Sequence, residues 1–317
     1  MDTPTSPSRA TDGISSPSSL PTSLALGVGP GRSITDSKPR SYSSLRAAWI
    51  PLAALCLAFF VEMVDNTLLT IALPTIGRDL QGSTTSLQWI TGAYSLTFGG
   101  LLLTAGSIAD RFGRRRVLQV GLTAFGLMSL LVLVVTSTGE LIALRAGLGI
   151  AAAAMAPITN SLVFRLFEDQ ALQMRAMTVM IVVGMSGFIL GPLLGGTALA
   201  HVSWQWLLLV NAPIALIAFL GVRLGVAEDR PEDLTADALD FPGAALTILG
   251  IGLACYTLTS GVEHGWLDWS TLLSAAGVVA AILGFVWRER HTKFPMLVLK
   301  LFRNRTVRGA TLAQLGT

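Results

Sequence analysis

The chain has 317 residues, of which 52% are hydrophobic and only 13% are charged, and its mean hydropathy is +0.63. Soluble domains carry about 25% charged residues, so this composition excludes a water-soluble globule and indicates a polytopic membrane protein. The two cysteines, Cys56 and Cys255, fall in apolar segments. They provide neither a disulfide framework nor a ligand cluster, so we expect no metal and no cofactor.

The first element is a polar segment at residues 1–44, rich in Ser, Thr, Pro and Gly. Such a segment cannot bury enough apolar surface to offset the entropy of ordering, so we predict a disordered cytoplasmic tail. Eight apolar runs follow, each able to cross a ~30 Å hydrocarbon core as a helix. Their approximate limits are 47–73, 87–109, 117–136, 140–162, 176–199, 204–226, 241–260 and 270–287.

The basic residues predict how these spans are oriented. With the N-terminus in the cytoplasm, 20 of the 22 lysines and arginines fall on the cytoplasmic side, while Arg78 lies outside and Arg145 lies within a span. The positive-inside rule therefore favours a multi-pass protein of the plasma membrane with a cytoplasmic N-terminus. Topology accounts for the pI of about 9.2, and no nucleic-acid partner is expected.

The first apolar run contains two carboxylates, in the stretch FFVEMVDNTLLTIALPTIG at residues 59–77. Glu62 and Asp65 are three residues apart and share one side of a helix, where lipid would be an unfavourable neighbour. Two close acids in a low dielectric resist double ionisation, so at least one is expected to hold a proton near neutral pH. Such a group suits proton coupling or capture of a cationic substrate. Glu62 could alternatively hydrogen-bond a neighbouring helix.

The loop between the second and third spans reads GSIADRFGRRRV, residues 106–117. A positive-inside anchor with a glycine turn would explain the arginines, but it explains Asp110 poorly. The stretch resembles the major facilitator superfamily signature G-x-L-A-D-R-x-G-R-R, with Ile108 in place of Leu. The resemblance implies a cytoplasmic gate latched by Asp110, with Arg111 and Arg114 as its partners. The signature residues here are Gly106, Asp110, Arg111, Gly113 and Arg114.

In the fourth span, LIALRAGLGIAAAAMAP at residues 141–157 places Arg145 near the outer end. The guanidinium could reach the interface by snorkelling, or it could face the bundle interior and tune a carboxylate. The run resembles the fourth-helix motif of the same superfamily, in which an arginine is implicated in proton coupling. Leu148 stands where that motif has glutamine, so the hydrogen-bond partner of Arg145 is left open.

The fifth span carries GMSGFILGPLLGG, residues 184–196, with glycines spaced by four. This spacing lets a neighbouring helix approach closely, and Pro192 is expected to bend the axis. Helix packing alone would account for such a face. The stretch also resembles the antiporter motif G-x-x-x-G-P-x-x-G-G, which marks exporters of the superfamily and is typically lacking in its importers. Its residues here are Gly187, Gly191, Pro192, Gly195 and Gly196.

Further stretches resemble one subfamily, the fourteen-span drug:proton antiporters. VDNTLLTIALP in the first span is similar to D-x-T-V-V-N-V-A-L-P, with Thr70 where Asn is usual. WQWLLLVNAPI, residues 204–214, is similar to the sixth-helix motif W-R-W-x-F-x-x-N-x-P, with Gln205 and Leu208 as departures. LDFPGAAL and SGVEHGW resemble the two linker helices, and FPMLVLKLFRNRTVRG resembles the cytoplasmic lead-in to a second half.

The resemblance implies an all-α polytopic membrane protein built on the major facilitator fold. We expect a six-helix transporter bundle at 45–226, two linker transmembrane helices at 227–290, and a cytoplasmic lead-in at 291–317 that starts a second half. A complete member has six helices, two linkers and six more. We therefore expect a partial sequence, truncated after about eight helices, whose partner is the missing C-terminal half.

The implied function is proton-coupled antiport that exports amphipathic drugs, antibiotics or secondary metabolites. Asp65, Glu62 and Arg145 would serve proton coupling and substrate binding, and a proton gradient would drive export. The expected partners are the amphipathic substrate, protons and membrane lipid. The alternatives are a facilitator-type importer of small metabolites and a non-transporting scaffold. The glycine–proline motif and the paired acids argue against the importer, and Asp110 with Arg145 argues against the scaffold. No nucleophile–base pair or phosphate loop appears, so we expect no enzyme.

Overall fold

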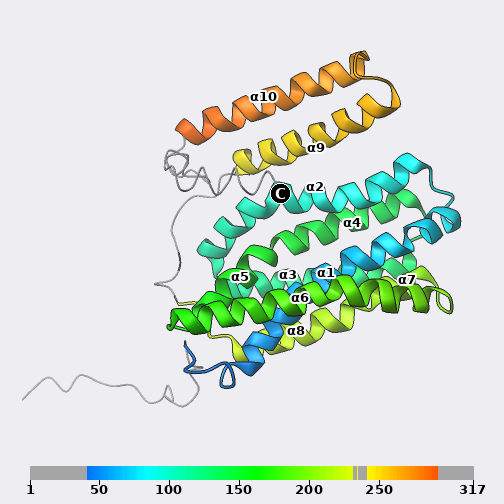
Figure 1. Cartoon of the computed structure of the whole chain (residues 1–317). Coiled ribbons are helices and arrows are strands. Elements are labelled where there is room, and N and C mark those ends of the chain that lie inside the picture. Colours follow the sequence, from blue (N-terminus) through cyan, green and yellow to red (C-terminus); the bar gives the residue numbers. More distant parts are fainter. Residues whose placement is uncertain (1–40, 231–233, 235–240, 292–317) are drawn as a thin grey trace, which may run out of the picture. The chain divides into compact units, whose positions relative to one another are not determined.

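The computed structural model describes residues 41–230, 234 and 241–291, and every regular element among them is a helix (Figure 1). In chain order these are α1 (Trp49–Asp79), α2 (Thr84–Phe112), α3 (Arg114–Leu131) with the 3-10 turn η2 (Val132–Val134), α4 (Thr138–Ala153), α5 (Ala156–Arg165), α6 (Gln170–Leu199), α7 (Trp204–Leu209), α8 (Asn211–Gly225), α9 (Phe241–Glu263) and α10 (Trp269–His291). The predicted tail, up to residue 40, and the predicted lead-in, from residue 292, lie outside the described residues.

The helices confirm a multi-pass membrane protein. Seven of them, with α4–α5 and α7–α8 each counted as one, are long and apolar enough to cross a membrane within the described part of the chain. The bent pair Thr84–Leu102 and Thr104–Phe112 makes an eighth if it is one span, as the sequence predicts. Helix α1 runs past the predicted limit at residue 73 to Asp79, because the apolar pattern continues through Pro74 to the buried Ile76.

Side-chain caps fix where several spans begin. The hydroxyl of Ser83 accepts the backbone N–H of Ser86 at the start of α2. Ser137 and Glu140 form a reciprocal capping box at the start of α4. Asp169 accepts the N–H of Ala171 at the start of α6. Each cap satisfies donors that the first turn of a helix leaves unpaired, so the short loops end at defined residues.

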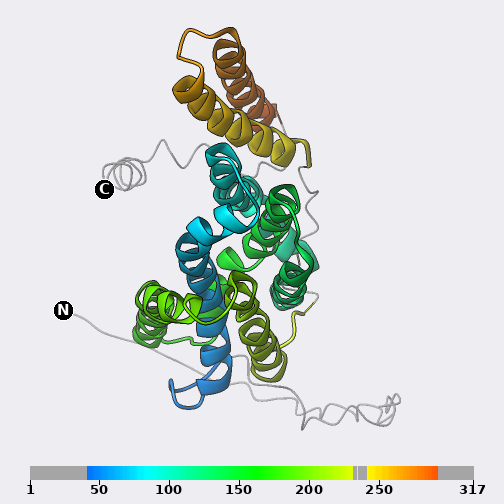
Figure 2. The ribbon, with the colours of Figure 1, turned by 90° about the vertical axis from the view of Figure 1, so that its right-hand side faces the viewer.

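Helix α1 lies between α6 and α8, and α2 packs against α4 (Figures 1 and 2). Within its most apolar window, 61% of the α1 residues are buried, against 11% for α9 and 17% for α10. A helix buried on most sides within a membrane bundle is a place where polar groups can be kept away from lipid. The packing therefore makes α1 the helix best placed to carry a buried polar site.

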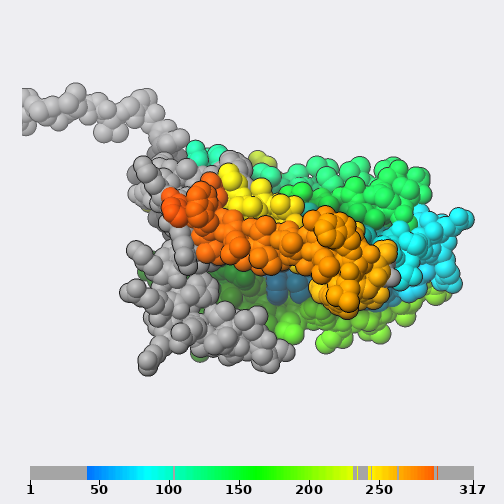
Figure 3. All heavy atoms as spheres, turned by 90° about the horizontal axis from the view of Figure 1, so that it is seen from above, coloured from blue at the N-terminus to red at the C-terminus, as the bar shows by residue number. Residues whose placement is uncertain are grey.

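Helices α9 and α10 form an antiparallel hairpin, whose outer face in Figure 3 is mainly α10, in orange. Hydroxyl groups join the two helices: Thr257 bonds to Ser274 at 2.8 Å, and Ser260 bonds to Thr271 at 2.9 Å. Such bonds hold transmembrane helices together without burying a charge. Hydrogen bonds between neutral hydroxyl groups therefore hold the two helices of the hairpin together.

The hairpin contacts the bundle where α9 meets α2. Gly100 of α2 faces Ile248 of α9, and a Cβ built on Gly100 would lie 2.7 Å from Cγ1 and 3.1 Å from Cα of that isoleucine. Because the second of these is a backbone atom, it cannot turn aside as a flexible side chain would. The absence of a side chain at Gly100 is what lets the two helices approach so closely.

Candidate functional site

A buried ion pair joins the first and fourth spans. Oδ2 of Asp65, on α1, lies 2.5 Å from Nη1 of Arg145, on α4, and their side chains are 1% and 0% exposed. A third helix contributes Asn211, at the start of α8, whose Nδ2 donates to Oδ1 of Asp65 at 2.7 Å. A carboxylate is costly inside a membrane protein unless it is paired and hydrogen-bonded. Arg145 thus faces the bundle interior, and the partner that the sequence left open is Asp65.

An aromatic ring completes the surroundings of Arg145. Its guanidinium carbon lies 4.5 Å from the ring centroid of Tyr94, on α2, a distance typical of a cation–π contact. Nε and Nη2 of Arg145 have no hydrogen-bond partner among the described residues. The guanidinium is therefore held by one ion pair and one ring face, and it keeps unused donors inside the bundle.

Glu62, the other acid of the first span, has a different environment. It lies almost one turn before Asp65 on α1 and is 3% exposed. Its Oε1 has no hydrogen-bond partner in the described part of the chain, so that oxygen does not bond to a neighbouring helix. Asp65 has its charge balanced by Arg145, whereas Oε1 of Glu62 remains available inside the bundle. The two acids that the sequence groups together are not equivalent.

The sixth span is interrupted beside this cluster. Helix α7 ends at Leu209 and α8 begins at Asn211, and Pro213 has no N–H to continue the ladder of backbone bonds to Leu209. Sequence reasoning includes Asn211 in a motif without giving it a role, and it assigns none to Tyr94. An amide in an apolar run is a signal that could have identified the first. The sequence holds no comparable signal for the second.

Three of the antiporter-motif glycines lie where α6 packs on α1. Gly187, Gly191 and Gly195 are all buried. A Cβ on Gly191 would overlap the hydroxyl of Thr67, and one on Gly195 would lie 2.7 Å from Cδ2 of Leu68. Thr67 also donates to the carbonyl of Gly187 at 3.3 Å. The prediction that these glycines allow close approach is confirmed, and the neighbour is the helix that carries Asp65.

The other two residues of this motif lie elsewhere on α6. Pro192 is exposed and sits inside a helix that continues to Leu199. Gly196 is exposed, and a Cβ there would meet nothing within 4 Å. Their side of α6 is therefore separate from the face that packs on α1. The expected bend at Pro192 stays a prediction.

At the cytoplasmic end predicted from the arginines, Asp110 pairs with one of its two expected partners. Its Oδ1 lies 3.0 Å from Nε and 2.9 Å from Nη2 of Arg114. The guanidinium of Arg111 instead lies over the ring of Phe112, 5.7 Å from its centroid. Arg114 is the first residue of α3, so this ion pair bridges the break between α2 and α3. Gly106 lies in α2 with open space where a Cβ would be.

Gly113 makes the turn between α2 and α3. Its φ is +102°, a conformation that glycine adopts at low cost. A Cβ there would lie 2.5 Å from Oδ2 of Asp229, which follows the sixth span. The same oxygen accepts the backbone N–H of Arg115 at 3.0 Å and so caps the start of α3. The glycine turn is confirmed, and the acid that occupies the space beside it is an addition from the structure.

Arg115 ties this turn to the end of the sixth span. Its side chain is 9% exposed, with Nη1 3.0 Å from Oε1 of Glu228. Its Nη2 donates to the carbonyl of Arg223 at 2.8 Å. Sequence reasoning missed Glu228 and Asp229, although two adjacent acids directly after a span, opposite an arginine-rich loop, are a usable signal. Together these contacts fix the loop between α2 and α3 against α8.

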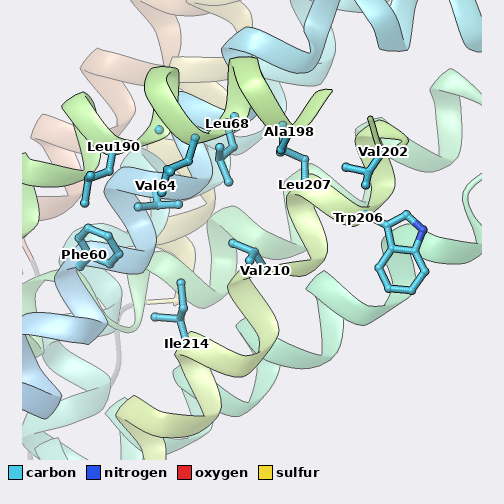
Figure 4. A pocket seen from close by; sticks show the side chains of 13 residues that line it. Phe60, Val64, Leu68, Leu190, Ala198, Val202, Trp206, Leu207, Val210 and Ile214 are labelled. Atoms are coloured by element: carbon cyan, nitrogen blue, oxygen red, sulfur yellow. The ribbon is translucent and has the colours of Figure 1, made fainter. Parts of the chain in front are cut away.

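An apolar cavity of about 290 Å³ lies between α1, α6, α7 and α8 (Figure 4). Phe60 and Leu190 line one part of it, and Trp206, Val210 and Ile214 line another. Neither of the two acids nor Arg145 belongs to its lining. The cavity is therefore apolar and separate from the ion pair of Asp65 and Arg145.

Comparison with known proteins identifies the family. Residues 55–288 match the model of the Major Facilitator Superfamily. The chain belongs to this superfamily. Among its relatives there, the cephamycin export protein CmcT of Amycolatopsis lactamdurans is 37% identical over 281 residues, which are 88% of this chain and 58% of that protein. The puromycin resistance protein pur8 of Streptomyces alboniger is 38% identical over 268 residues, 84% of this chain and 52% of the relative.

A third relative is the multidrug efflux pump LfrA of Mycolicibacterium smegmatis, 33% identical over 84% of this chain and 53% of its own length. The chain thus spans about half the length of these relatives. A solved peptide transporter POT in complex with sulfate matches with a TM-score of 0.58 at 17% identity, covering 81% of this chain and 55% of the other. That likeness shows the fold of the superfamily.

Proposed function

We propose that this protein is an exporter of amphipathic drugs, antibiotics or secondary metabolites that works by exchange with protons across the plasma membrane. Relatives named for cephamycin export, puromycin resistance and multidrug efflux support the export of such compounds. The observation that carries proton exchange is the buried pair of Asp65 and Arg145. When a carboxylate is fully buried and its charge is balanced by one guanidinium, gain or loss of a proton changes the electrostatic free energy of the bundle.

The proposed proton step follows from the geometry. A proton that binds Asp65 neutralises the carboxylate and removes most of its attraction to Arg145. The guanidinium keeps its contact with Tyr94 and is free to use its spare donors. Because the pair joins α1 to α4, proton binding loosens the link between two spans. Superfamily transporters work by rocking one helical bundle against another around a midplane site, so a link of this kind is suited to control that motion.

Glu62 is the proposed contact for the substrate. Its buried Oε1 without a partner offers a charge or a hydrogen-bond acceptor to a cationic or polar group of an amphipathic compound. The closely packed α1–α6 face, with Gly187 and Gly191 against α1, supplies a firm wall on the other side of the same helix. The Glu62→Gln variant should therefore keep proton exchange and narrow the substrate range towards neutral compounds.

The cytoplasmic contacts are the proposed gate on the inner side, with the N-terminus in the cytoplasm. The pair of Asp110 and Arg114 and the turn at Gly113 form a corner between α2 and α3, where Asp229 caps the start of α3. Because the chain spans about half the length of its relatives, export is proposed for the whole transporter. A second helical bundle is the expected partner of this corner and of the exposed face of α6.

The test is the Asp65→Asn variant of the whole transporter in everted membrane vesicles. The change keeps size and hydrogen bonding but removes the titratable group, so substrate-dependent proton release should be lost while insertion is kept. Asp79→Asn is the matched control, because it makes the same change near the end of the same helix, where the carboxylate accepts from Trp204 at 3.1 Å. Proton release that survives in the Asp65 variant at the level of the control would refute proton exchange at this site.

A further inference from the structure

Asn211 occupies a position whose hydrogen-bonding capacity is only partly used. It is 0% exposed at the first residue of α8. Its Nδ2 donates to Asp65 at 2.7 Å, while its own Oδ1 has no hydrogen-bond partner among the described residues. An enclosed amide oxygen without a partner is costly, and native proteins rarely keep one without a use. Asn211 therefore places an unused hydrogen-bond acceptor next to the carboxyl group of Asp65.

The chemistry of an amide explains what this acceptor can do. An ionised carboxylate only accepts hydrogen bonds, whereas a protonated carboxyl also donates one. A side-chain amide presents donors on one side and an acceptor on the other, and rotation about its last torsion exchanges them. In its present orientation Asn211 donates to Asp65. After a half-turn it would accept the O–H of the protonated acid. Arg145 has donors only, so it cannot make that second bond.

We propose that Asn211 is a positioning residue that hydrogen-bonds Asp65 in both of its protonation states by turning its amide, and so joins proton binding to the break between α7 and α8. The inference rests on the proposed function, in which Asp65 exchanges a proton. It assigns Asn211 no contact with the substrate. Its effect is to hold the acid in one place while its charge changes, and to transmit that change to the sixth span.

The charged and titratable groups around Asp65 are few. Glu62 lies on its own helix, Arg145 reaches it from α4, and Tyr94 of α2 contacts Arg145. Helices α5, α6, α7 and α8, which also pack against α1, contribute no buried acid or base from their described residues. Asn211 is thus the neutral group that directly contacts Asp65 by a side-chain hydrogen bond.

The experiment measures both side chains in the chain reconstituted into lipid nanodiscs. The infrared band of the protonated Asp65 carboxyl, identified by its loss in Asp65→Asn, gives the pH midpoint of that acid. Solid-state NMR of the side-chain amide of Asn211, identified by its loss in Asn211→Leu, reports the orientation and partner of the amide. We expect the amide signal to change with pH at the same midpoint as the carboxyl band. An amide signal that stays constant while Asp65 titrates would overturn the proposal.

The Asn211→Leu variant tests the size of the effect. A hydrogen bond to a charged carboxylate is stronger than one from a neutral carboxyl, so losing the amide should move the pH at which the Asp65 infrared band changes. Asn160→Leu makes the same change at an exposed position of α5 and should leave that midpoint in place. If Asn211 were only structural, Asn211→Leu would lower thermal stability and leave the pH midpoint of the Asp65 band unchanged. That result would also overturn the proposal. If Asn211→Leu does not fold, the NMR titration of the native chain decides.

Failure of this inference can be told from failure of the proposed function. The two titrations need no transport, whereas the vesicle assay of Asp65→Asn needs no information on Asn211. Proton release that persists in that variant removes proton exchange at Asp65. An amide that follows the Asp65 midpoint would still establish the link between the two residues. An Asp65 that stays in one protonation state over the accessible pH range would overturn both.

Discussion

Two carboxylate–arginine pairs stand in contrasting surroundings. Asp65 and Arg145 are 1% and 0% exposed inside the bundle. Asp110, at the end of α2, and Arg114, at the start of α3, are 46% and 34% exposed. Inside a low dielectric an unpaired charge is very costly, whereas at a wetted surface water replaces a lost partner. The buried pair is therefore essential to the stability of the fold, whereas the exposed pair contributes little to it.

The corner between α2 and α3 depends on its backbone more than on its ion pair. Gly113 adopts a φ of +102° with Asp229 packed against it. That carboxylate accepts backbone N–H groups at the start of α3. Water cannot supply the backbone conformation that glycine adopts here, whereas it can replace a lost partner of the exposed ion pair. At this corner, stability should therefore be most sensitive to substitution of the glycine. Inside the bundle, stability should be most sensitive to substitution of the charged residues.

The largest expected effect is at the buried pair. Arg145→Leu leaves Asp65 enclosed without a counter-charge, and we expect a loss of about 3–5 kcal/mol in the free energy of unfolding. The double variant Asp65→Asn with Arg145→Leu should recover much of that loss, because no charge is then left unpaired. Thermal and denaturant unfolding in detergent would measure both. Arg78→Leu, at an exposed arginine near the end of α1, is the control and should cost little. A double variant no more stable than Arg145→Leu would contradict the assignment of the cost to charge.

An intermediate effect is expected at the turn. Gly113→Ala places a Cβ against the Asp229 carboxylate in a backbone conformation that alanine rarely adopts, and should cost about 1–3 kcal/mol. Gly106→Ala is the matched control, since its Cβ would enter open space within α2. That change should be neutral or stabilise the helix by up to about 1 kcal/mol. Unfolding curves of the two variants compare them directly. Equal stability would show that the turn at Gly113 is not constrained.

The smallest effect on stability is expected at the exposed pair. Asp110→Asn, Arg114→Gln and their combination should each change the free energy of unfolding by less than about 1 kcal/mol, because half-exposed pairs are screened. A double-mutant cycle from unfolding curves isolates their interaction. A coupling energy comparable to that of Asp65 and Arg145 would remove the contrast between the two regions. If Asp110 serves the proposed gate, the same variants should lower export far more than stability.

Sequence patterns identified the charged residues and the glycines within the spans. They did not identify the side chains that contact them. The length and apolarity of the runs predicted the spans, and the spacing of Gly187, Gly191 and Gly195 predicted a tightly packed face. The offset of Gly113 predicted a turn. Pairing depends on which faces of distant helices meet, and a periodic pattern does not contain that information. Asp65 and Arg145 are 80 residues apart, so the sequence could only leave the surroundings of Arg145 as two alternatives.

The same reason hides the residues that the patterns missed. Asn211 is 146 residues from Asp65, and Asp229 is 114 residues from the amide that it caps. Neither contact follows from local propensity, because each is made by a helix end that tertiary packing brings into place. Tyr94 reads as an ordinary aromatic residue of an apolar run. Its contact with Arg145 follows from the packing of α2 on α4, which no composition or spacing specifies.

The glycine at which α9 meets α2 has a consequence for the bilayer around the protein. With Gly100 against Ile248, an acyl chain has no room to enter between these helices at that level. The annular lipid on this side therefore touches the hairpin and not that strip of α2. A tilt of α9 in a thinner or thicker bilayer would press on α2 at Gly100, and α2 ends in the corner that holds Asp110. The contact that joins the hairpin to the bundle contains no buried charge among its described residues.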